Sequence, residues 1–212
     1  MIPLVLRMKR EAHRRIARAQ DIVVETLYEV FDDAVLHGGT AIWRCYQGNR
    51  FSEDVDVYIS HDVKKIELIF LKFQKKGFLI VKKKVSERSI YSTLKFQDAL
   101  VRFEAIFKKS RGILKEYETI DGNFITVYTL TPEEFITEKI DTYVQRKKIR
   151  DLYDIFFLLR HVQDFSKITP KVAQLMHSYE KPVDEADLKV LLLEGLVPSA
   201  MQMREYIGRK RG

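Results

Sequence analysis

Residues 54–59 read Asp-Val-Asp-Val-Tyr-Ile, and every second side chain in this segment is a branched aliphatic one. The alternation predicts a β-strand, because successive side chains of a strand point to opposite faces. Asp54, Asp56 and Tyr58 then share one face, and the aliphatic side chains point to the core. The chain must therefore build a sheet that buries one side of this strand and keeps two neighbouring carboxylates on the other.

Two carboxylates at this spacing repel each other, and a bound cation relieves the repulsion. Oxygen ligands suit a hard cation, so Asp54 and Asp56 are candidate ligands of Mg²⁺, with Mn²⁺ as a second choice. Taken alone, the same Asp-x-Asp pattern also fits an ordinary solvated sheet surface. The pair therefore needs support from other parts of the sequence.

A glycine pair lies upstream of the carboxylates, between a short apolar step at residues 34–36 and a segment of helical composition. Glycines let the backbone approach a ligand closely, and free N–H groups at a helix start favour phosphate. Glycine pairs also mark ordinary turns. A triphosphate site here would use backbone groups, hydroxyls and a cation from Gly38, Gly39, Thr40, Arg50 and Ser52.

The remaining pattern predicts an α+β fold. Helices are expected over residues 11–31 and 61–76, and strands over residues 78–85, 89–96, 100–107 and 124–130. The first three of these strands have short connections and should be antiparallel neighbours. Thr131-Pro132-Glu133-Glu134 is a capping box that starts a helical C-terminal half, with breaks near residues 166–170 and 181–184. We expect a domain of residues 1–130, with a mixed or antiparallel sheet flanked by helices, and a helical domain of residues 131–212.

The segment GGTAIWRCYQGNRFSEDVDVYI resembles the signature of the AbiEii/AbiGii toxins within the nucleotidyltransferase superfamily. That signature is a Gly-Gly or Gly-Ser turn, a short helix, and two acidic residues separated by one apolar residue. The run Arg-Phe-Ser-Glu-Asp-Val-Asp is typical of this branch. The resemblance implies a nucleotidyltransferase-like sheet with a metal and nucleotide site on Asp54 and Asp56.

Polymerase-like nucleotidyl transfer generally uses a third acid on a neighbouring strand. The candidate is Glu104, because Val101, Phe103 and Ala105 form the apolar face of its segment and leave Glu104 on the opposite one. A glutamate paired with Arg102 or with a lysine on an exposed face fits the pattern equally well. Asp98 is a rival that falls in an apparent turn.

The segment TPEEFITEKIDTYVQRKKIRDLYDIFFLLRH carries the second part of the resemblance. From the residues alone, Lys139 lies on an apolar stripe, where its ammonium needs an acidic partner or an anion, or extends past its neighbours to solvent. The family has a helix with a lysine followed by an Arg-Asp-x-x-Asp element, here residues 150–154. The resemblance implies that Lys139 contacts nucleotide phosphates and that Asp151 is a catalytic acid of a helical domain completing the active-site cleft. Asp151 and Asp154 could instead form ion pairs with Arg146, Lys147 or Arg150.

The resemblance implies a toxin of a toxin–antitoxin system that transfers a nucleoside monophosphate from a nucleoside triphosphate to an acceptor hydroxyl in a Mg²⁺-dependent reaction. A tRNA end is the expected acceptor, another RNA is the next choice, and a cognate antitoxin protein is the expected partner. Two alternatives stay open. One is transfer to a protein or a small molecule, and the other is a non-catalytic member that binds nucleotide or a partner only.

Composition agrees with these expectations without deciding between them. The 212 residues carry a formal net charge of +7, which favours polyanionic partners such as RNA. The single cysteine, Cys45, excludes an intramolecular disulfide and a thiolate zinc site. No segment approaches the roughly 18 uninterrupted apolar residues of a membrane span, and no signal peptide is recognised, so a cytoplasmic protein without membrane partners is expected.

Overall fold

The computed structural model describes residues 3–210, so the outermost residues of both predicted domains, 1–2 and 211–212, lie outside the described residues. The chain divides into two compact units. The first unit is Met1–Gln47 with Phe51–Leu130, and the second is Gly48–Arg50 with Thr131–Gly212. Mixed α and β structure with a seven-stranded mixed sheet confirms the predicted fold class. The sequence did not indicate that Gly48–Arg50 packs with the second unit.

The sheet of the first unit has the strand order β3-β4-β5-β2-β1-β7-β6. As predicted, β3, β4 and β5 are antiparallel neighbours. β2 runs parallel to β5 and antiparallel to β1, so the strand of the two aspartates lies in the middle of the sheet. β6 was not predicted. The strands are β1 Val35–His37, β2 Asp54–Ile59, β3 Leu79–Val85, β4 Ser89–Phe96, β5 Ala99–Phe107, β6 Ile113–Glu118 and β7 Phe124–Thr129.

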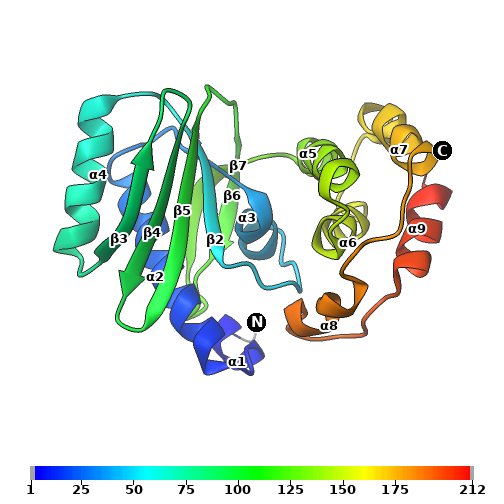
Figure 1. Ribbon diagram of the computed structural model, residues 1–212, viewed down its shortest axis with the longest axis horizontal. Coiled ribbons are helices and arrows are strands. Elements are labelled where there is room, and N and C mark those ends of the chain that lie inside the picture. The colour runs from blue at the N-terminus through cyan, green and yellow to red at the C-terminus, as the bar shows by residue number, and fades with distance from the viewer. Residues whose placement is uncertain (1–2, 211–212) are drawn as a thin grey trace. The chain divides into compact units, whose positions relative to one another are not determined.

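Helices α2 and α4 pack on one face of this sheet (Figure 1). The rings of Phe73 in α4 and Phe103 in β5 lie 5.5 Å apart in an edge-to-face contact, which identifies the covered face. Val55 and Val57 of β2 are fully buried, as the alternation predicts. The face that carries Asp54, Asp56 and Glu104 is therefore the one opposite to α2 and α4. The helices of this unit are α1 Leu4–Arg7, α2 Glu11–Tyr28, α3 Gly38–Cys45 and α4 Val63–Lys75.

A buried arginine fixes the position of α3. The guanidinium of Arg44 donates to the carboxylate of Asp21 at 3.0 Å, to the Ala17 carbonyl at 3.1 Å and to the Glu118 carbonyl at 2.9 Å. Tyr117 donates a further hydrogen bond to Asp21 at 3.0 Å. The guanidinium also lies 4.1 Å from the centroid of the Trp43 ring, so stacking adds to the ion pair. These contacts join the last turn of α3 to α2 and β6.

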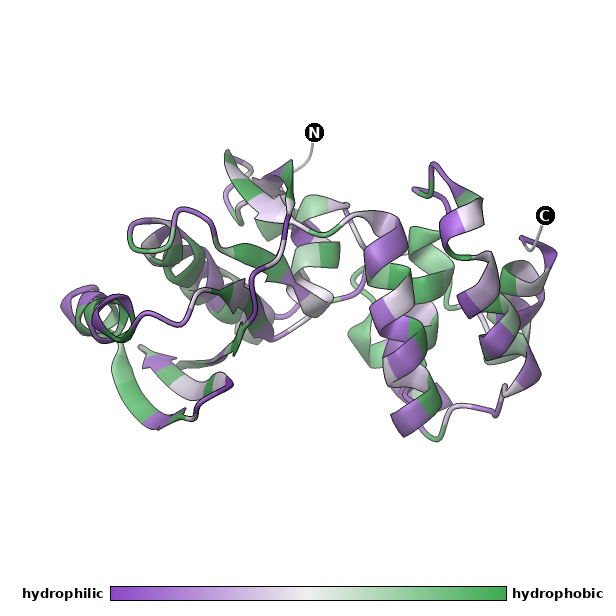
Figure 2. Cartoon of the chain, turned by 90° about the horizontal axis from the view of Figure 1, so that it is seen from above, coloured by the Kyte–Doolittle hydropathy of each residue, from purple (hydrophilic) through white to green (hydrophobic). Residues whose placement is uncertain are grey.

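The second unit is helical after Leu130. Its first helix begins with the predicted capping box, in which Thr131 and Glu134 satisfy each other's backbone N–H groups. That helix ends at Lys147, whose backbone is left-handed with φ 52°, and this break was not predicted. Figure 2 shows hydrophobic and hydrophilic residues mixed along each helix, as expected where one face is buried. The elements are α5 Pro132–Arg146, α6 Ile149–Leu158, η1 Phe165–Lys167, α7 Thr169–His177, η2 Glu185–Asp187, α8 Leu188–Leu191 and α9 Ala200–Arg209.

Between residues 3 and 210, no helix has both the length and the apolar character that crossing a membrane requires.

Arg44→Met should lower the free energy of unfolding by about 3–5 kcal/mol, because it leaves the buried carboxylate of Asp21 without its counter-charge. Urea unfolding at pH 7 measures this change. Arg15→Met is the matched control, since Arg15 and Asp98 form an exposed ion pair at 3.2 Å. Its loss should cost less than about 1 kcal/mol. Equal costs for the two variants would contradict the anchoring role of Arg44.

Candidate active site

Three predicted acids lie on adjacent strands and share one sheet face. Asp56 of β2 is the direct register partner of Glu104 of β5, and Asp54 lies two residues before Asp56 on the same face. All three side chains are half-buried, whereas the intervening Val55 and Val57 are fully buried. The alternation in the sequence therefore places the three carboxylates as neighbours on the face away from α2 and α4.

The start of α3 touches the carboxylate of Asp56. Gly38 has φ +71°, and a Cβ atom added there would lie 2.0 Å from Oδ2 of Asp56. No side chain fits in that space, and an L-residue is strained at this φ. Glycine at this position allows the helix start and the carboxylate to come together. The backbone N–H groups of a helix start also favour negative charge.

Thr40 and Ser52 lie beside this contact and serve to hold it. The Thr40 hydroxyl is buried and donates to the backbone carbonyl of Asp54. The amide of Gln20 in α2 donates to the Thr40 hydroxyl at 3.3 Å and to the Ser52 carbonyl at 2.9 Å. The structure therefore places the Thr40 side chain inside the unit, where it ties the first turn of α3 to the start of β2.

Arg102 binds Asp54 through two parallel hydrogen bonds, from Nε at 2.5 Å and from an Nη at 2.7 Å. The guanidinium thus pairs with Asp54, whereas the sequence suggested Glu104 as its alternative partner. Burial and the charge of Asp54 raise the pKa of Glu104 above its ordinary value, although Arg102 acts in the opposite direction. Asp98, the rival third acid, lies in the exposed turn between β4 and β5 and pairs with Arg15.

The chemistry of the donors fits a hard cation, because Asp54, Asp56 and Glu104 offer only carboxylate oxygens. As the side chains are arranged, however, the described part of the chain holds no group of three or more His, Cys, Asp or Glu side chains set to bind a metal. The two hydrogen bonds from Arg102 engage both oxygens of Asp54. A cation would therefore have to compete with Arg102 for Asp54.

In the second unit, Asp154 is the centre of a buried ion-pair cluster. Arg50 donates to its two oxygens at 2.8 Å each, and the Lys139 ammonium lies 2.8 Å from Oδ2. A backbone bridge from Arg50 to Leu192 fixes the segment that carries the arginine. Burial alone would raise the pKa of Asp154, but the charges of Arg50 and Lys139 outweigh burial and lower it. Arg50, predicted as a triphosphate ligand, thus has a carboxylate partner within its own unit.

Asp151 belongs to the same cluster. Arg146 donates to its two oxygens at 2.7 and 2.8 Å, and Lys139 donates to Oδ1 at 3.4 Å. The side chain of Asp151 is fully buried, whereas that of Arg146 is 40% exposed. The sequence had named Arg146 among three possible partners of this acid. Lys139 bridges Asp151 and Asp154, which accounts for an ammonium group on the apolar stripe of α5.

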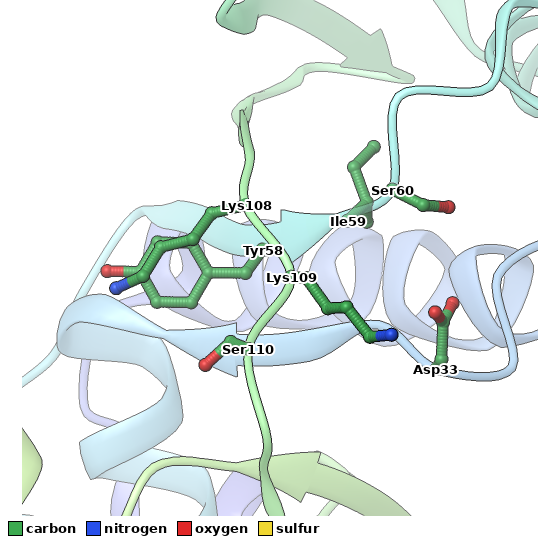
Figure 3. A pocket seen from close by; sticks show the side chains of 7 residues that line it. All are labelled: Asp33, Tyr58, Ile59, Ser60, Lys108, Lys109 and Ser110. Atoms are coloured by element: carbon green, nitrogen blue, oxygen red, sulfur yellow. The ribbon is translucent and has the colours of Figure 1, made fainter.

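A polar cavity of about 220 Å³ lies at the other end of β2, beyond Tyr58. Two lysines of the loop after β5 line it, but Figure 3 shows that they point to opposite sides of the loop. The Lys108 ammonium lies 4.5 Å from the centroid of the Tyr58 ring, and Lys109 extends toward Asp33. The two cations do not converge, so this cavity is poorly suited to hold a phosphate between them.

A protein-family model described as the nucleotidyl transferase AbiEii toxin of type IV toxin–antitoxin systems matches residues 22–205. The chain belongs to this family. The recognition made from the glycine turn and the Asp-x-Asp strand is therefore confirmed. Membership identifies the chain as a nucleotidyltransferase and implies an antitoxin as its partner. A comparison with curated protein sequences gives no match.

Two solved structures have a similar fold. JHP933 from Helicobacter pylori has a TM-score of 0.66 at 19% identity, with 95% of this chain and 93% of that chain covered. MenT4, a nucleotidyltransferase toxin from Mycobacterium tuberculosis, has a TM-score of 0.66 at 16% identity, with 94% and 82% covered. At these identities the likeness concerns the fold, and it agrees with the mixed sheet described above.

Two residues of the candidate site were missed by sequence reasoning. Gln20 holds Thr40 and Ser52, and its signal was a polar side chain amid the apolar positions of a helix. Arg102 was noted only as a neighbour of Glu104, and its pairing with Asp54 depends on the parallel register of β2 and β5. That register joins residues 48 apart in the chain, which no local pattern reveals.

Gly38→Ala should destabilise the protein by more than about 2 kcal/mol and displace the Asp56 carboxylate, because the new Cβ combines strain at positive φ with a clash. Gly77→Ala is the control. Gly77 has φ +92° and its added Cβ would meet only the Phe96 ring at 3.6 Å, so it isolates the strain of about 1–2 kcal/mol. Thermal and urea unfolding measure the loss of stability in both variants. An equal loss would show that the clash with Asp56 does not contribute.

Asp154→Asn should cost about 3–5 kcal/mol at pH 7, since it leaves Arg50 and Lys139 buried beside a neutral group. Because the pKa of Asp154 is lowered by folding, its ionised carboxylate stabilises the folded protein fully at pH values above its unfolded-state pKa of about 4. This stabilisation is lost as the pH falls through the pKa of Asp154 in the folded protein. In urea unfolding, the difference in unfolding free energy between the native protein and Asp154→Asn should therefore decrease below about pH 4. Asp141→Asn is the control, because it removes a half-exposed pair with Lys171 at 2.5 Å, and it should cost less than about 1 kcal/mol.

Proposed function

We propose that this chain transfers a nucleoside monophosphate from a nucleoside triphosphate to the 3′ hydroxyl of an RNA, most simply a tRNA end, with release of pyrophosphate. The observation that carries the proposal is the arrangement of Asp54, Asp56 and Glu104 on adjacent strands, with the glycine start of α3 against Asp56. Phosphoryl and nucleotidyl transfer depends mainly on positioning and on neutralising charge, and this arrangement serves both needs.

Asp54 and Asp56 would hold Mg²⁺ or Mn²⁺, with Glu104 as the third carboxylate. A bound divalent ion supplies neutralisation of the charge that develops on the phosphate and the leaving group. Glu104 has a further role in the proposal. It would help to activate the acceptor hydroxyl as a general base.

The triphosphate would be bound by the N–H groups of Gly38 and Gly39 at the start of α3. Thr40 and Ser52 act in the proposal by holding that turn on β2, through the bonds from Thr40 to Asp54 and from Gln20 to Ser52. Lys139, Arg50 and Asp151 stay predicted members of the site. Their cluster brings together the cations Arg50, Lys139 and Arg146, which is the kind of group that binds phosphate.

RNA is the favoured acceptor for two reasons. The chain carries a net charge of +7, and the family comprises toxins, for which an essential RNA is a suitable target. Transfer to a protein or a small molecule would use the same carboxylates. An acceptor test must therefore offer both kinds of macromolecule at once.

Purified protein with Mg²⁺ should label RNA from one of the four labelled nucleoside triphosphates, and Asp56→Asn or Asp54→Ala should reduce the rate at least about 100-fold. Asp98→Asn is the matched control, because it removes a carboxylate from an exposed turn of the same unit. Folding is checked by circular dichroism. Transfer that survives both substitutions would show that the assigned acids are wrong. Label on protein and none on RNA would select the alternative acceptor.

A further inference from the structure

The sheet face of the three acids continues outward over two more strands. A first row of register partners runs from Asp56 in β2 to Glu104 in β5, Tyr91 in β4 and Lys84 in β3. Residues paired in this way project from the same face, with about 4.8 Å between neighbouring strands. The row thus leads over about 14 Å from a carboxylate of the candidate active site to a lysine on the edge strand.

A second row lies beside the first and has the same order of chemistry. It runs from Asp54 in β2 to Arg102 in β5, Thr93 in β4 and Lys82 in β3. Both rows start with acids, pass through half-buried polar or aromatic side chains, and end with exposed lysines. The charge on this face therefore changes sign from β2 to the edge of the sheet.

Tyr91 lies at the middle of this face. The Lys82 ammonium is 4.9 Å from the centroid of its ring, and the ring is half-buried. The opposite face of the same strands is closed by α2 and α4, where Ile90 and Leu94 of β4 are buried. An aromatic ring with a cation on it, on the sheet face opposite to α2 and α4, is the arrangement on which a base can stack.

We infer that this face, defined by Tyr91, Thr93, Lys82 and Lys84, binds the single-stranded 3′ segment of the acceptor RNA. The inference rests on the proposed function. The terminal hydroxyl lies at Glu104 and Asp56, the preceding base stacks on Tyr91, and backbone phosphates contact Lys82 and Lys84. Charge complementarity supports RNA as the occupant, because an extended polyanion meets lysines at one end of the face and its uncharged hydroxyl meets the acids at the other.

Lysines on an edge strand also have a simpler role, which is to prevent other strands from pairing with the sheet edge. The two roles make different demands. Edge protection needs a charge of either sign, whereas RNA binding needs a positive one. Replacing the lysines by glutamate therefore separates them, since it keeps the edge charged and reverses its attraction for phosphate.

The test compares Lys82→Glu/Lys84→Glu with Lys64→Glu/Lys75→Glu. The control pair lies on α4, behind the opposite face, and changes the net charge of the protein by the same amount. For the first variant we expect the KM for RNA to rise at least about ten-fold, with the KM for the triphosphate and the thermal midpoint unchanged. Fluorescence anisotropy measures binding of a 5′-labelled oligoribonucleotide at several salt concentrations. The slope of log binding constant against log salt concentration should decrease in magnitude by about 1.4, at about 0.7 for each lost phosphate contact.

Tyr91 supplies a second and independent variant. Tyr91→Phe keeps a ring for stacking and should bind the oligoribonucleotide as the native protein does, whereas Tyr91→Ala should weaken binding about ten-fold or more. The assigned face would be wrong if both lysine variants changed RNA binding equally, or if Tyr91→Ala bound RNA as the native protein does. In either case, RNA labelling by the native protein would still support the proposed function. Native protein that neither labels nor binds RNA would overturn both.

Discussion

The close approach of Gly38 to Asp56 is the contact on which the rest of the candidate site depends. The carboxylate occupies the space in which any other residue would carry its Cβ, so the first turn of α3 lies directly against β2. Thr40 reinforces the contact from the buried side by bonding to the carbonyl of Asp54. Arg44 anchors the other end of the short helix to α2 and β6. The two aspartates are therefore positioned by a rigid helix and a central strand, which is the kind of support that a site relying on positioning needs.

The fold was largely predictable because most elements bury one face completely. β2 was predicted with its observed bounds, since Val55 and Val57 are core residues and the intervening acids are not. β6 was not predicted because it is an edge strand whose sequence shows no alternation. Only its last two residues, Tyr117 and Glu118, are buried. The end of α5 was not predicted because Lys147 adopts the left-handed conformation there. Glycine or asparagine usually occupies this position at the end of a helix.

The candidate site was predictable where side chains follow local periodicity, and unpredictable where they pair across the fold. Strand alternation placed Asp54, Asp56 and Glu104 on one face without any knowledge of the register. It could not show that Arg102 binds Asp54, because that pair needs the parallel alignment of two strands. Likewise Asp154 was considered only with nearby basic residues, whereas its guanidinium partner, Arg50, lies 104 residues away.

Each unit contains its own cluster of paired charges, and the two clusters differ in chemistry. On the sheet face, Arg102 pairs with Asp54, and Asp56 and Glu104 are the carboxylates beside this pair. In the helical unit, Arg50, Lys139 and Arg146 pair with the carboxylates of Asp151 and Asp154. Charges buried without full compensation are costly, so such clusters are retained where a ligand completes them or where they fix a conformation. Carboxylate oxygens suit a hard divalent cation, whereas a group of guanidinium and ammonium ions suits an anion, so the side chains of each unit set the kind of ligand that the unit accepts.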